Sequence, residues 1–580
     1  MKSIGAKIMF NRLVHHNVKY VFGYPGGAIL PVLNEFYNQN KIKYILSRTE
    51  SGGSFMAEGY AKATRKPGVV MVTSGPGAIN IMTSLQNALM DGTPILGLSG
   101  QVSTKVLGTD AFQEADIIGI SKPCTKWNSM ITNTEDINDT IDYAFEQIYK
   151  ERYGPVLLDL PKNVMSSELV FNVSKFKKSF PVKKINIESQ EITPQFINKL
   201  IYQSERPIIL AGQGIFQSDA VKELRKVCEM YDIPITTTLL GLGSFNENNP
   251  LSLKMVGMHG SYYANKAVQN CDLLINFGSR FDDRIIGNPE KFCPKAKIVH
   301  VDILKPNICK VIKPTFYINN DCKKVLQDII KYEVDINKFE NYYPFKNQKW
   351  FQTIKEWRNV KFSFPKKNVL QGREVISELN KLIKKSKKRF TIVADVGAHQ
   401  MWAAQFIDYN YPKVKFITSG GLGTMGYALP ASLGYKLGSP DDVVICICGD
   451  GGFSMSFNEL ITAANNGINV KVLIINNSTQ LMVKMWQDKF YDKQQIGVKM
   501  DNPNFDLVAK SLGCKGMTIK NSKKLIKKLE YMIEYTGPIV VNCLTDDNEA
   551  VLPMVSPGKA LDDMIIDENN TDKISGDAPC

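Results

Sequence analysis

The most constraining feature of this 580-residue sequence is a repeated order of segments, in which an apolar run is followed by a glycine-rich turn and a helical stretch. Examples of the runs with their turns are VKYVFGYPGG (18–27), PIILAGQG (207–214) and DVVICICGDGG (442–452). A repeated strand–helix order is typical of parallel sheets covered by helices. Because a single core stops growing at roughly 250–300 residues, the length predicts several domains. We expect an α/β protein with three doubly wound parallel-sheet domains.

The apolar runs form three groups, separated by a polar, lysine-rich stretch near 164–190 and an aromatic, charged stretch near 337–352. Changes of composition of this kind are common at domain boundaries. We predict domains at 1–165, 188–335 and 365–560.

The net charge of +14 raises the question of nucleic-acid binding. The lysines are scattered, however, and the clusters KKSKK (384–388) and KKLIKK (523–528) have the spacing of solvated helix faces. The sequence has no continuous apolar run of 18 residues, and its first residues, interrupted by Lys7 and Arg12, do not have the pattern of a secretory h-region. We expect a cytoplasmic protein that binds neither nucleic acid nor membrane.

Cysteine and histidine usage limits the chemistry. The chain has 11 cysteines without a CxxC pair and only 5 histidines. This pattern is typical of reduced core thiols and argues against a zinc site with several histidines. Carboxylates, amides, the backbone or a cofactor must therefore supply the chemistry.

Two consecutive predicted strands end in oxygen-bearing side chains. In the stretch 448–477, one apolar run ends at Gly449-Asp450-Gly451 and the next ends at Asn476-Asn477. In a strand–helix–strand unit both carboxyl ends lie on one edge of the sheet, so Asp450 and Asn477 should converge. A carboxylate, an amide oxygen and a carbonyl form an incomplete oxygen shell that suits Mg²⁺ bound to a diphosphate. An ordinary tight turn and strand end is the alternative for each segment alone.

At these residues the chain resembles thiamine-diphosphate enzymes, and further segments narrow the resemblance to the catalytic subunit of acetohydroxyacid (acetolactate) synthases. Those segments include FGYPGGAILPV (22–32), GSRFDDR (278–284), HQMWAAQ (399–405), ITSGGLGTMGYALPA (417–431) and VLPMVSPGKALDDMI (551–565). The resemblance covers nearly the whole chain. It implies the three-domain fold of the thiamine-diphosphate enzymes, with thiamine diphosphate, Mg²⁺ and FAD as cofactors.

The resemblance also assigns the coenzyme site. Glu50 would be the carboxylate that protonates the pyrimidine ring, and Thr479 would add its carbonyl to the Mg²⁺ ligands Asp450 and Asn477. Met425 would hold the coenzyme bent. The remaining coenzyme contacts would be Gly397, His399, Gln400, Gly423, Gly449, Gly451, Met482 and Val483.

Four positions near these residues depart from the family pattern. Thr49 and Ser51 replace the usual His and Gln beside Glu50, and Leu481 and Met485 replace a Gly and a Gln after Asn477. A leucine in place of a glycine costs space or requires a φ above zero that leucine adopts poorly.

The acceptor substrate and FAD are assigned in the same way. Arg284 would bind the carboxylate of the acceptor 2-ketoacid, Trp486 would shape its pocket, and Gly27 would supply a backbone donor. Gln113 and Lys162 would line the entrance, together with Phe112. The residues matching FAD contacts are Arg152, Gly212, Gly214, Thr238, Leu239, Met258, His259, Gly278, Arg280, Asp302 and Asp321.

The implied function is decarboxylation of pyruvate and transfer of the hydroxyethyl group to pyruvate or 2-oxobutyrate, the first common step of branched-chain amino-acid biosynthesis. The active site would be shared between the subunits of a homodimer or homotetramer, and a regulatory small subunit would be a separate chain. Two alternatives stay open. One is another thiamine-diphosphate enzyme, such as a pyruvate oxidase or a carboligase. The other is a non-catalytic homologue, suggested by the four departures.

Overall fold

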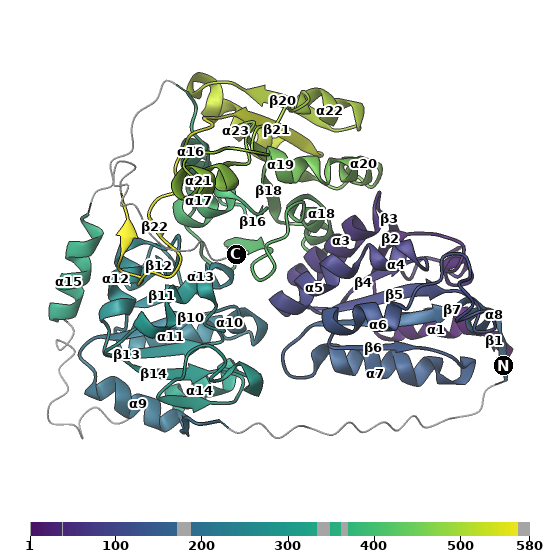
Figure 1. Cartoon of the computed structure of the whole chain (residues 1–580), viewed down its shortest axis with the longest axis horizontal. Coiled ribbons are helices and arrows are strands. Elements are labelled where there is room, and N and C mark those ends of the chain that lie inside the picture. Colours follow the sequence, from purple (N-terminus) through teal and green to yellow (C-terminus); the bar gives the residue numbers. More distant parts are fainter. Residues whose placement is uncertain (1, 38, 171–186, 333–347, 361–368, 567–580) are drawn as a thin grey trace.

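The structure is a computed structural model that describes residues 2–37, 39–170, 187–332, 348–360 and 369–566. Within these ranges, three larger sheets are present, with six, seven and six strands, and each is parallel throughout. Figure 1 shows one sheet in each of three bodies, with helices packed against them. This confirms the predicted α/β class and its three parallel-sheet domains.

The N-terminal sheet has the strand order β3-β2-β4-β5-β7-β6. The strands are β2 (Tyr20–Tyr24), β3 (Lys43–Leu46), β4 (Gly68–Val72), β5 (Ile95–Gln101), β6 (Trp127–Met130) and β7 (Pro155–Pro161). The helices are α1 (Gly5–His15), α2 (Leu30–Asn34), α3 (Glu50–Thr64), α4 (Pro76–Ile79), α5 (Met82–Asp91), α6 (Ile117–Ser121), α7 (Ile137–Tyr149) and α8 (Lys162–Ser166). An antiparallel pair, β1 (Lys2–Ile4) and β8 (Glu168–Val170), joins the two ends of this domain.

The middle sheet has the order β12-β11-β10-β13-β14-β15-β9. Its strands are β9 (Gln190–Glu191), β10 (Pro207–Ala211), β11 (Ile235–Thr237), β12 (Ser252–Met255), β13 (Leu273–Phe277), β14 (Lys297–Val301) and β15 (Phe316–Ile318). The helices are α9 (Pro194–Gln203), α10 (Gly214–Gln217), α11 (Val221–Met230), α12 (Tyr262–Asn270), α13 (Asp283–Ile286), α14 (Cys322–Lys331) and α15 (Gln348–Arg358).

The C-terminal sheet has the order β17-β16-β18-β19-β21-β20. The strands are β16 (Phe390–Ala394), β17 (Val414–Thr418), β18 (Val443–Gly449), β19 (Val470–Asn476), β20 (Lys515–Ile519) and β21 (Ile539–Leu544). The helices are α16 (Gly372–Lys385), α17 (Ala398–Phe406), α18 (Ala428–Gly438), α19 (Asp450–Ser454), α20 (Leu460–Asn465), α21 (Leu481–Phe490), α22 (Phe505–Ser511) and α23 (Leu525–Glu534).

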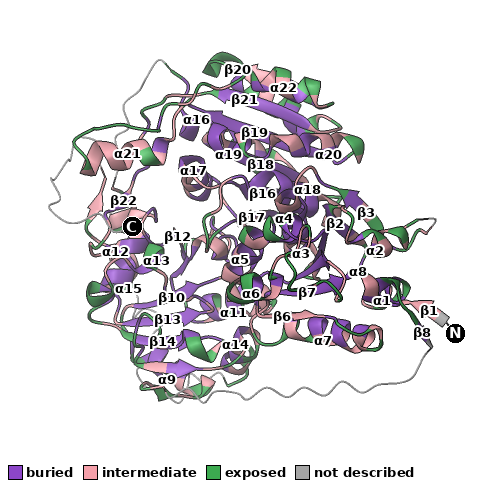
Figure 2. Ribbon diagram, turned by 45° about the vertical axis from the view of Figure 1, so that its right-hand side comes forward, coloured by how far each residue is buried: buried purple, intermediate pink, exposed green. Residues whose placement is uncertain are grey.

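The central strands read as continuous apolar runs because helices cover both faces of each parallel sheet. Every residue of β4, β5, β7, β10, β13, β16 and β19 is buried. Figure 2 shows these sheets as the buried interior of each body. The carboxyl ends of the strands, where polar residues follow, are therefore the places where a site can form.

The N-terminal and C-terminal domains meet where helices α3 and α18 pack backbone to backbone. A methyl group on Gly59 would lie 1.9 Å from the carbonyl oxygen of Ala431, and one on Gly434 would lie 1.8 Å from that of Met56. Both positions accept only glycine without a shift of the helices. Apolar residues of both domains belong to one buried cluster around this contact.

The last described residues return to the middle domain. The amide of Val555, in β22 (Met554–Val555), donates to the carbonyl of Met258 at 2.8 Å, and β22 pairs with β23 (Met564–Ile565). Leu561 is buried in a cluster of middle-domain residues. The segment therefore closes one side of the space between the middle and C-terminal domains.

Candidate active site

A cavity of about 1220 Å³ lies at the carboxyl ends of the middle and C-terminal strands. The middle domain supplies much of its wall, together with the turns after β16 and β17, helix α21 and residues 555–558. The N-terminal domain contributes Met90 and Glu151–Tyr153. Its position at the strand ends is that of a cofactor and substrate site in an α/β protein, and its volume exceeds the range of about 300–1,000 Å³ that is usual for one small ligand.

Many of the residues predicted from the sequence line this single cavity. From the predicted FAD set these are Arg152, Gly214, Thr238, Leu239, Met258, His259, Gly278, Arg280, Asp302 and Asp321. From the predicted coenzyme and acceptor sets they are Gly397, Gln400, Gly423, Met482, Arg284 and Trp486. The space predicted for FAD is therefore continuous with the space predicted for the acceptor substrate.

Glycines bring two turns of the middle domain together at the cavity floor. A methyl group on Gly212 would lie 2.3 Å from the carbonyl oxygen of Gly278, and one on Gly214 would lie 2.7 Å from its Cα. Gly278 has a φ of +64°, which favours glycine. Gly212 is not in the wall itself, so its function is to allow this close approach.

Several polar atoms at the cavity have no protein partner. His259 Nδ1 and Ser279 Oγ are buried and form no hydrogen bond within the described ranges. Burial lowers the pKa of His259 to about 4, so its imidazole is neutral. Buried unpaired polar atoms are rare, which favours a polar ligand in this part of the cavity.

Arg152 reaches the same space from the N-terminal domain. Its guanidinium donates to the carbonyls of Leu89 at 2.7 Å and Met90 at 2.6 Å. Burial lowers its pKa to about 10, which still leaves it charged at neutral pH. Its charge has no carboxylate partner among the described ion pairs, so it can meet an anionic ligand.

Three further predicted FAD residues hold turns beside the cavity. Thr238 Oγ1 accepts the amide of Gly241, Asp302 accepts the amide of Leu304 at 2.7 Å, and Asp321 begins α14 by accepting the amide of Lys323 at 2.9 Å. These bonds fix the backbone around the cavity, whether or not the side chains also touch a ligand.

The ends of β18 and β19 lie side by side, as the strand–helix–strand unit predicted. Gly449 pairs with Ile475 in the parallel register. The Nδ2 of Asn502 donates to Asp450 Oδ2 at 2.6 Å and to Asn476 Oδ1 at 3.1 Å, so it bridges the two strand ends. Asn477 is buried, and its Oδ1 accepts the amide of Thr479 at 3.1 Å.

The electrostatics at Asp450 favour a cation. The carboxylate is buried, it forms no ion pair within the described residues, and burial raises its pKa above the ordinary value. The described part of the chain holds no group of three or more His, Cys, Asp or Glu side chains that could bind a metal. A cation here would thus take most of its ligands from amides, carbonyls and the bound substrate or cofactor.

His399 lies beside the Gly449 turn, outside the cavity wall, while its neighbours Gly397 and Gln400 line the cavity. His399 Nε2 accepts the amide of Gly449 at 3.2 Å, and burial lowers its pKa to about 4. A methyl group on Gly397, whose φ is +147°, would lie 2.8 Å from the His399 ring. Gln400 Nε2 donates to Thr418 Oγ1 at 2.7 Å. A neutral histidine thus connects the turns after β16 and β18.

Helix α21 explains the departure at Leu481. Leu481 is the first residue of this helix, it is 6% exposed, and it belongs to the buried cluster of the C-terminal domain rather than to the cavity wall. The left-handed residue in this turn is Ser478, with a φ of +53°. The leucine therefore occupies the core of the C-terminal domain and needs no left-handed backbone of its own.

The same helix presents two predicted site residues to the cavity. Met482 and Trp486 lie in its wall, and Trp486 stacks on Phe490 with ring centroids 5.1 Å apart. Val483 points elsewhere, being outside the wall and 46% exposed. Met485 packs against the buried cluster of the C-terminal domain.

The turn between β17 and α18, Ser419–Gly426, is named the glycine loop here. Ser419–Gly423 line the cavity, while Met425 is half-buried and outside that wall. The amide of Gly426 donates to both oxygens of Asp395, at 3.0 and 3.1 Å. Burial raises the pKa of Asp395 to about 7.

Four predicted residues of the N-terminal domain, Glu50, Gly27, Gln113 and Lys162, lie outside this cavity. Glu50 is the first residue of α3, and its Oε2 accepts the Nδ2 of Asn80 at 3.0 Å. Thr49 caps this helix by accepting the amide of Gly52 at 3.0 Å. The threonine that stands in place of the usual histidine therefore stabilises the start of α3.

Arg284 lies in the cavity wall with a largely free side chain. Its side chain is 65% exposed, 3.6 Å from Asp283 and 3.3 Å (Nη1) from the Sδ of Met258. An exposed pair at this distance is weak, so the guanidinium is available to an anion.

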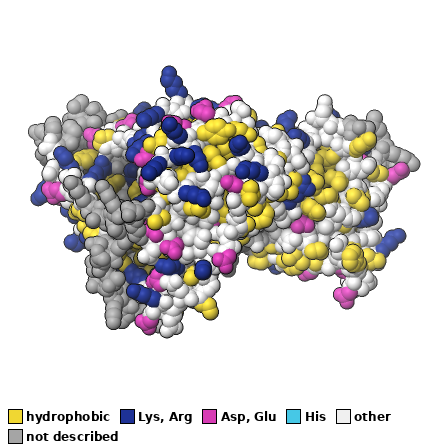
Figure 3. All heavy atoms as spheres, turned by 90° about the horizontal axis from the view of Figure 1, so that it is seen from above, with side chains coloured by type: hydrophobic (Ala, Val, Ile, Leu, Met, Phe, Trp, Pro, Cys, Tyr) yellow, Lys and Arg dark blue, Asp and Glu magenta, His cyan; other side chains and the backbone are white. Residues whose placement is uncertain are grey.

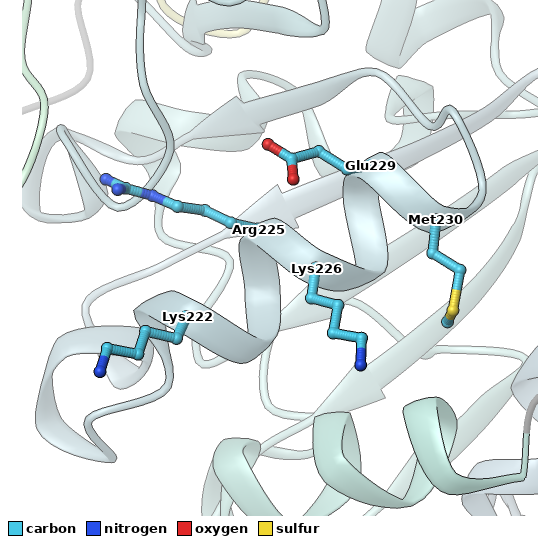
Figure 4. A pocket seen from close by; sticks show the side chains of 5 residues that line it. All are labelled: Lys222, Arg225, Lys226, Glu229 and Met230. Atoms are coloured by element: carbon cyan, nitrogen blue, oxygen red, sulfur yellow. The ribbon is translucent and has the colours of Figure 1, made fainter.

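A second hollow, of about 610 Å³, lies along α11 and shares no residue with the cavity. Figure 4 shows Lys222 and Lys226 leaving the helix in a direction different from that of Glu229. The Arg225 guanidinium in this hollow donates to the carbonyls of Ser244 and Tyr411 at 3.1 and 2.9 Å, and so joins the middle and C-terminal domains. Arg225 therefore holds two domains together here, and this hollow is separate from the candidate active site.

Comparison with known proteins agrees with this arrangement. Models of the thiamine pyrophosphate (thiamine diphosphate) enzymes match three stretches: the N-terminal TPP binding domain at 4–120, the central domain at 195–329 and the C-terminal TPP binding domain at 395–543. The mitochondrial acetolactate synthase of Schizosaccharomyces pombe is 41% identical, over 97% of this chain and 86% of that protein. The chain belongs to the acetolactate synthase family.

Further acetolactate synthases give the same result. The mitochondrial catalytic subunit of Saccharomyces cerevisiae is 40% identical, over 97% of this chain and 83% of that protein. The large subunit of Buchnera aphidicola is 38% identical, over 97% of this chain and 98% of that protein. Membership in the acetolactate synthase family confirms the resemblance noted in the sequence, the enzyme class and the thiamine diphosphate cofactor.

Sequence reasoning missed Asn502, which lies 52 residues beyond Asp450 in the chain. No spacing rule connects the two, because the intervening α21 segment folds back on itself. The amide of Gln480 donates to the carbonyl of Val498 at 2.7 Å, and that of Met500 to the carbonyl of Ser478 at 2.9 Å. Only this closed hairpin brings Asn502 to the strand ends.

Proposed function

We propose that this member of the acetolactate synthase family decarboxylates pyruvate and transfers the hydroxyethyl group to a second 2-ketoacid, pyruvate or 2-oxobutyrate. The reaction is the first common step of branched-chain amino-acid biosynthesis. One observation supports it most directly: Arg284 and Trp486, expected at the acceptor, share a cavity with Gly397, Gln400 and Gly423, expected at the coenzyme.

Asp450, Asn477 and the carbonyl of Thr479 would hold Mg²⁺, and the turns at Gly397 and Gly449–Gly451 would receive the diphosphate. The buried carboxylate of Asp450, which forms no ion pair within the described residues, supports this role, since a cation would compensate its charge. When bound, thiamine diphosphate supplies the electron sink for decarboxylation of a 2-ketoacid. Its apolar contacts would be Met425, Met482 and Val483.

Glu50 would hold the proton exchanged with the pyrimidine ring of the coenzyme. Its position at the N-terminus of α3 and its bond from Asn80 keep the carboxylate oriented and half-buried. Because Glu50 is outside the cavity of its own chain, we propose that it serves the site of a second subunit. Exposed apolar side chains support a self-association surface, among them Phe112 (88% exposed), Met455 (61%) and Leu30 (51%).

The acceptor would be bound by its carboxylate and its hydrocarbon part. Arg284 would bind the carboxylate through two parallel hydrogen bonds, and Trp486 would pack on the alkyl group. Gly27 would offer its amide, and no atom lies within 4 Å of where a methyl group on Gly27 would be. Gln113 and Lys162 would line the entrance from the same N-terminal domain as Gly27.

FAD would occupy the middle-domain part of the cavity. The unpaired His259 Nδ1 and Ser279 Oγ, the charged Arg152 and Arg280, and the close glycine turns support this placement. The cofactor would have a structural function, since the proposed reaction has no net oxidation or reduction.

A small regulatory subunit is a further proposal, supported by relatives whose names include large or catalytic subunit. The compartment stays a prediction. The sequence favours the cytoplasm, whereas the two fungal relatives cited are named mitochondrial. Within the described residues, none of the helices combines the length and the apolar character needed to cross a membrane.

The test is an acetolactate assay on the purified chain with pyruvate, Mg²⁺, thiamine diphosphate and FAD. We expect acetolactate as the product, and a loss of at least about 100-fold in kcat for Glu50→Gln, since general acid–base groups contribute about 10²–10⁴. The control is Glu146→Gln, an exposed change on α7 of the same domain, which should retain full activity.

Other outcomes would contradict the proposal. Hydrogen peroxide or acetyl phosphate in place of acetolactate would indicate a pyruvate oxidase. A wild-type protein that binds the coenzyme without forming any product would indicate a non-catalytic homologue.

A further inference from the structure

A buried polar cluster lies between the N-terminal and C-terminal domains, next to the cavity. It is formed by Glu58 and Lys62 of α3 and by Asn87 and Asp91 of α5. Lys62 Nζ lies 3.0 Å from Glu58 Oε1 and 2.9 Å from Asp91 Oδ2, with both carboxylates fully buried and the Lys62 side chain 9% exposed. Asn87 Nδ2 donates to Glu58 Oε1 and Oε2, at 2.9 and 2.8 Å.

This cluster reaches across the domain boundary to the glycine loop. Asp91 Oδ1 accepts the amide of Gly421 at 2.8 Å, and its Oδ2 accepts the amide of Gly420 at 3.3 Å. Lys62 Nζ donates to the carbonyl of Thr418, directly before the loop, at 3.0 Å. Asp91 is thus bonded at once to its counter-ion and to two consecutive amides of the other domain.

A second branch of the cluster holds the far part of the loop. Asn87 Oδ1 accepts the hydroxyl of Ser419, and Ser419 Oγ accepts the amide of Thr424 at 2.8 Å. The amide of Gly426 is held separately by Asp395. Four amides of the loop are therefore bonded to side-chain oxygens, and side chains rather than its own backbone determine its shape.

The glycine loop forms part of the site. Ser419–Gly423 line the cavity, and the loop carries Met425, the residue expected beneath the coenzyme. Gly423, with a φ of +74°, has open space around its missing Cβ. A displacement of about 1 Å in a loop that orients a reactant can cost about 100-fold in rate.

The charge arrangement explains why the acceptor of these amides is a carboxylate. Hydrogen bonds from amides to an ionised acceptor are about twice as strong as neutral ones. Lys62 balances a buried negative charge that would otherwise be costly. Burial raises the pKa of Glu58, and the Lys62 ammonium and the bonds from Asn87 oppose this shift.

We propose that Asp91, with Lys62 as its counter-ion, is a positioning residue of the coenzyme site. It fixes Gly420 and Gly421 and thereby sets the glycine loop, with Gly423 and Met425, at the distance that thiamine diphosphate requires. The proposal rests on the proposed function, in that thiamine diphosphate binds at this loop.

The test compares Asp91→Ala with Asp442→Ala, which removes another buried carboxylate, at the amino end of β18 in the C-terminal sheet. Asp442 is fully buried and bonded to Lys415 Nζ at 2.6 Å and to Thr391 Oγ1 at 2.9 Å. It precedes β18, whereas the predicted site residue Asp450 follows that strand at its other end. Each variant is purified as the full chain with Mg²⁺. Measured are the dissociation constant of thiamine diphosphate by equilibrium dialysis, kcat, KM for pyruvate and the urea midpoint.

We expect Asp91→Ala to raise the dissociation constant of thiamine diphosphate at least tenfold and to lower kcat, with KM for pyruvate changed less than threefold. Asp91→Asn retains an oxygen for the amide of Gly421 but loses the bond to Lys62, so its effect should be intermediate. Asp442→Ala should lower the urea midpoint while leaving the dissociation constant within twofold of wild type.

Three results would overturn the inference. In the first, the wild type binds thiamine diphosphate and Asp91→Ala binds it equally well, which leaves the proposed function intact. In the second, Asp442→Ala weakens binding as much as Asp91→Ala, so that general destabilisation explains the loss. In the third, the wild type itself fails to bind, which removes the proposed function as well. If Asp91→Ala does not fold, Asp91→Asn decides, with unchanged affinity contradicting the inference.

Discussion

Asn502 is the residue that links the two halves of the expected metal site. Its amide nitrogen bridges Asp450 and Asn476, at 2.6 and 3.1 Å, and so orients the carboxylate expected to bind Mg²⁺. Residues that orient a metal ligand are commonly worth about 10–100-fold in metal affinity. Asn502 is therefore expected to matter nearly as much as a direct ligand.

We predict that Asn502→Ala raises the Mg²⁺ concentration for half-maximal binding by about tenfold or more. Intrinsic fluorescence titration in the presence of thiamine diphosphate measures it, with the acetolactate assay as a second readout. The control is Asn504→Ala, which removes the cap of α22 at Asp506 but has no bond to Asp450. Equal Mg²⁺ affinity in Asn502→Ala and wild type would show that the bridge has no function in metal binding.

Glu247 is a buried carboxyl away from the site whose titration should be visible in the stability. Burial raises its pKa from 4.5 to about 8, and one oxygen accepts the amide of Tyr409 at 2.8 Å while the other has no partner within the described residues. Between pH 4.5 and about 8 the folded state holds a proton that the unfolded state has lost. The free energy of unfolding therefore falls with rising pH in this window, by at most about 1.4 kcal/mol per unit.

We predict that Glu247→Gln removes this fall, because the amide keeps an acceptor for Tyr409 and carries no charge. The difference in unfolding free energy between variant and wild type should be smallest near about pH 5 and grow in favour of the variant toward about pH 8. Urea titrations at several pH values measure it, with the exposed Glu356→Gln on α15 as control. A pH-independent difference would contradict the prediction.

At the scale of elements, helix α21 determines how the departures from the family pattern are tolerated. Leu481 begins the helix, with its side chain in the core and Met482 and Trp486 facing the cavity. The sequence comparison placed a leucine where the family has glycine and suggested a conflict with the coenzyme. The structure assigns that leucine to the core of the C-terminal domain.

We predict that Leu481→Ala lowers the free energy of unfolding by about 2–4 kcal/mol, the cost usual for a large-to-small change in a core. The dissociation constant of thiamine diphosphate should stay within threefold of wild type. Urea unfolding and equilibrium dialysis measure the two quantities. The control is Leu507→Ala on α22, where the side chain is 57% exposed. Tighter coenzyme binding in Leu481→Ala would show that the leucine does obstruct the site.

The elements predicted best from the sequence were those in which a regular apolar pattern is followed by residues that end a strand or helix. The strands at 207–211 and 443–449 are continuous apolar runs before glycine turns, so their positions and the meeting of Asp450 with the end of β19 could be predicted. The helix expected between β18 and β19, at 456–466, is a 3₁₀ turn followed by the short α20, and the further short helix α19 precedes it. Composition does not reveal this division. Part of the stretch expected to link two domains, 348–358, forms α15, because Trp350 and Ile354 bury one side of it.

At the scale of the whole molecule, the predicted site residues fall into two groups. Many of those in the middle and C-terminal domains line one cavity, while the expected Mg²⁺ ligands Asp450, Asn477 and Thr479 lie beyond its wall. Four residues of the N-terminal domain also lie outside it: Glu50, Gly27, Gln113 and Lys162. Lys and Arg side chains are interspersed with apolar and uncharged ones on the face shown in Figure 3. The way in which two subunits meet could not be predicted from the sequence, because a surface between folded subunits has no periodic residue pattern of its own.

We predict that two inactive variants, Glu50→Gln and Asp450→Asn, restore activity when they are mixed and reassociated. In a twofold dimer whose sites draw on both chains, each mixed dimer holds one intact site, so a random mixture should reach about a quarter of wild-type activity. The acetolactate assay measures it after dilution and concentration. The unmixed variants, treated identically, are the control. No recovery would mean that Glu50 and Asp450 serve the same site from one chain.

The glycine crossing of α3 and α18 has a mechanical consequence. At Gly59 and Gly434 main chain lies directly on main chain, and the side chains around this contact belong to one buried cluster shared by both domains. The first and third domains should then behave as one stiff frame in solution. We therefore expect the motions that admit substrate to be displacements of the middle domain relative to the first and third domains, or of helix α21 and residues 551–566.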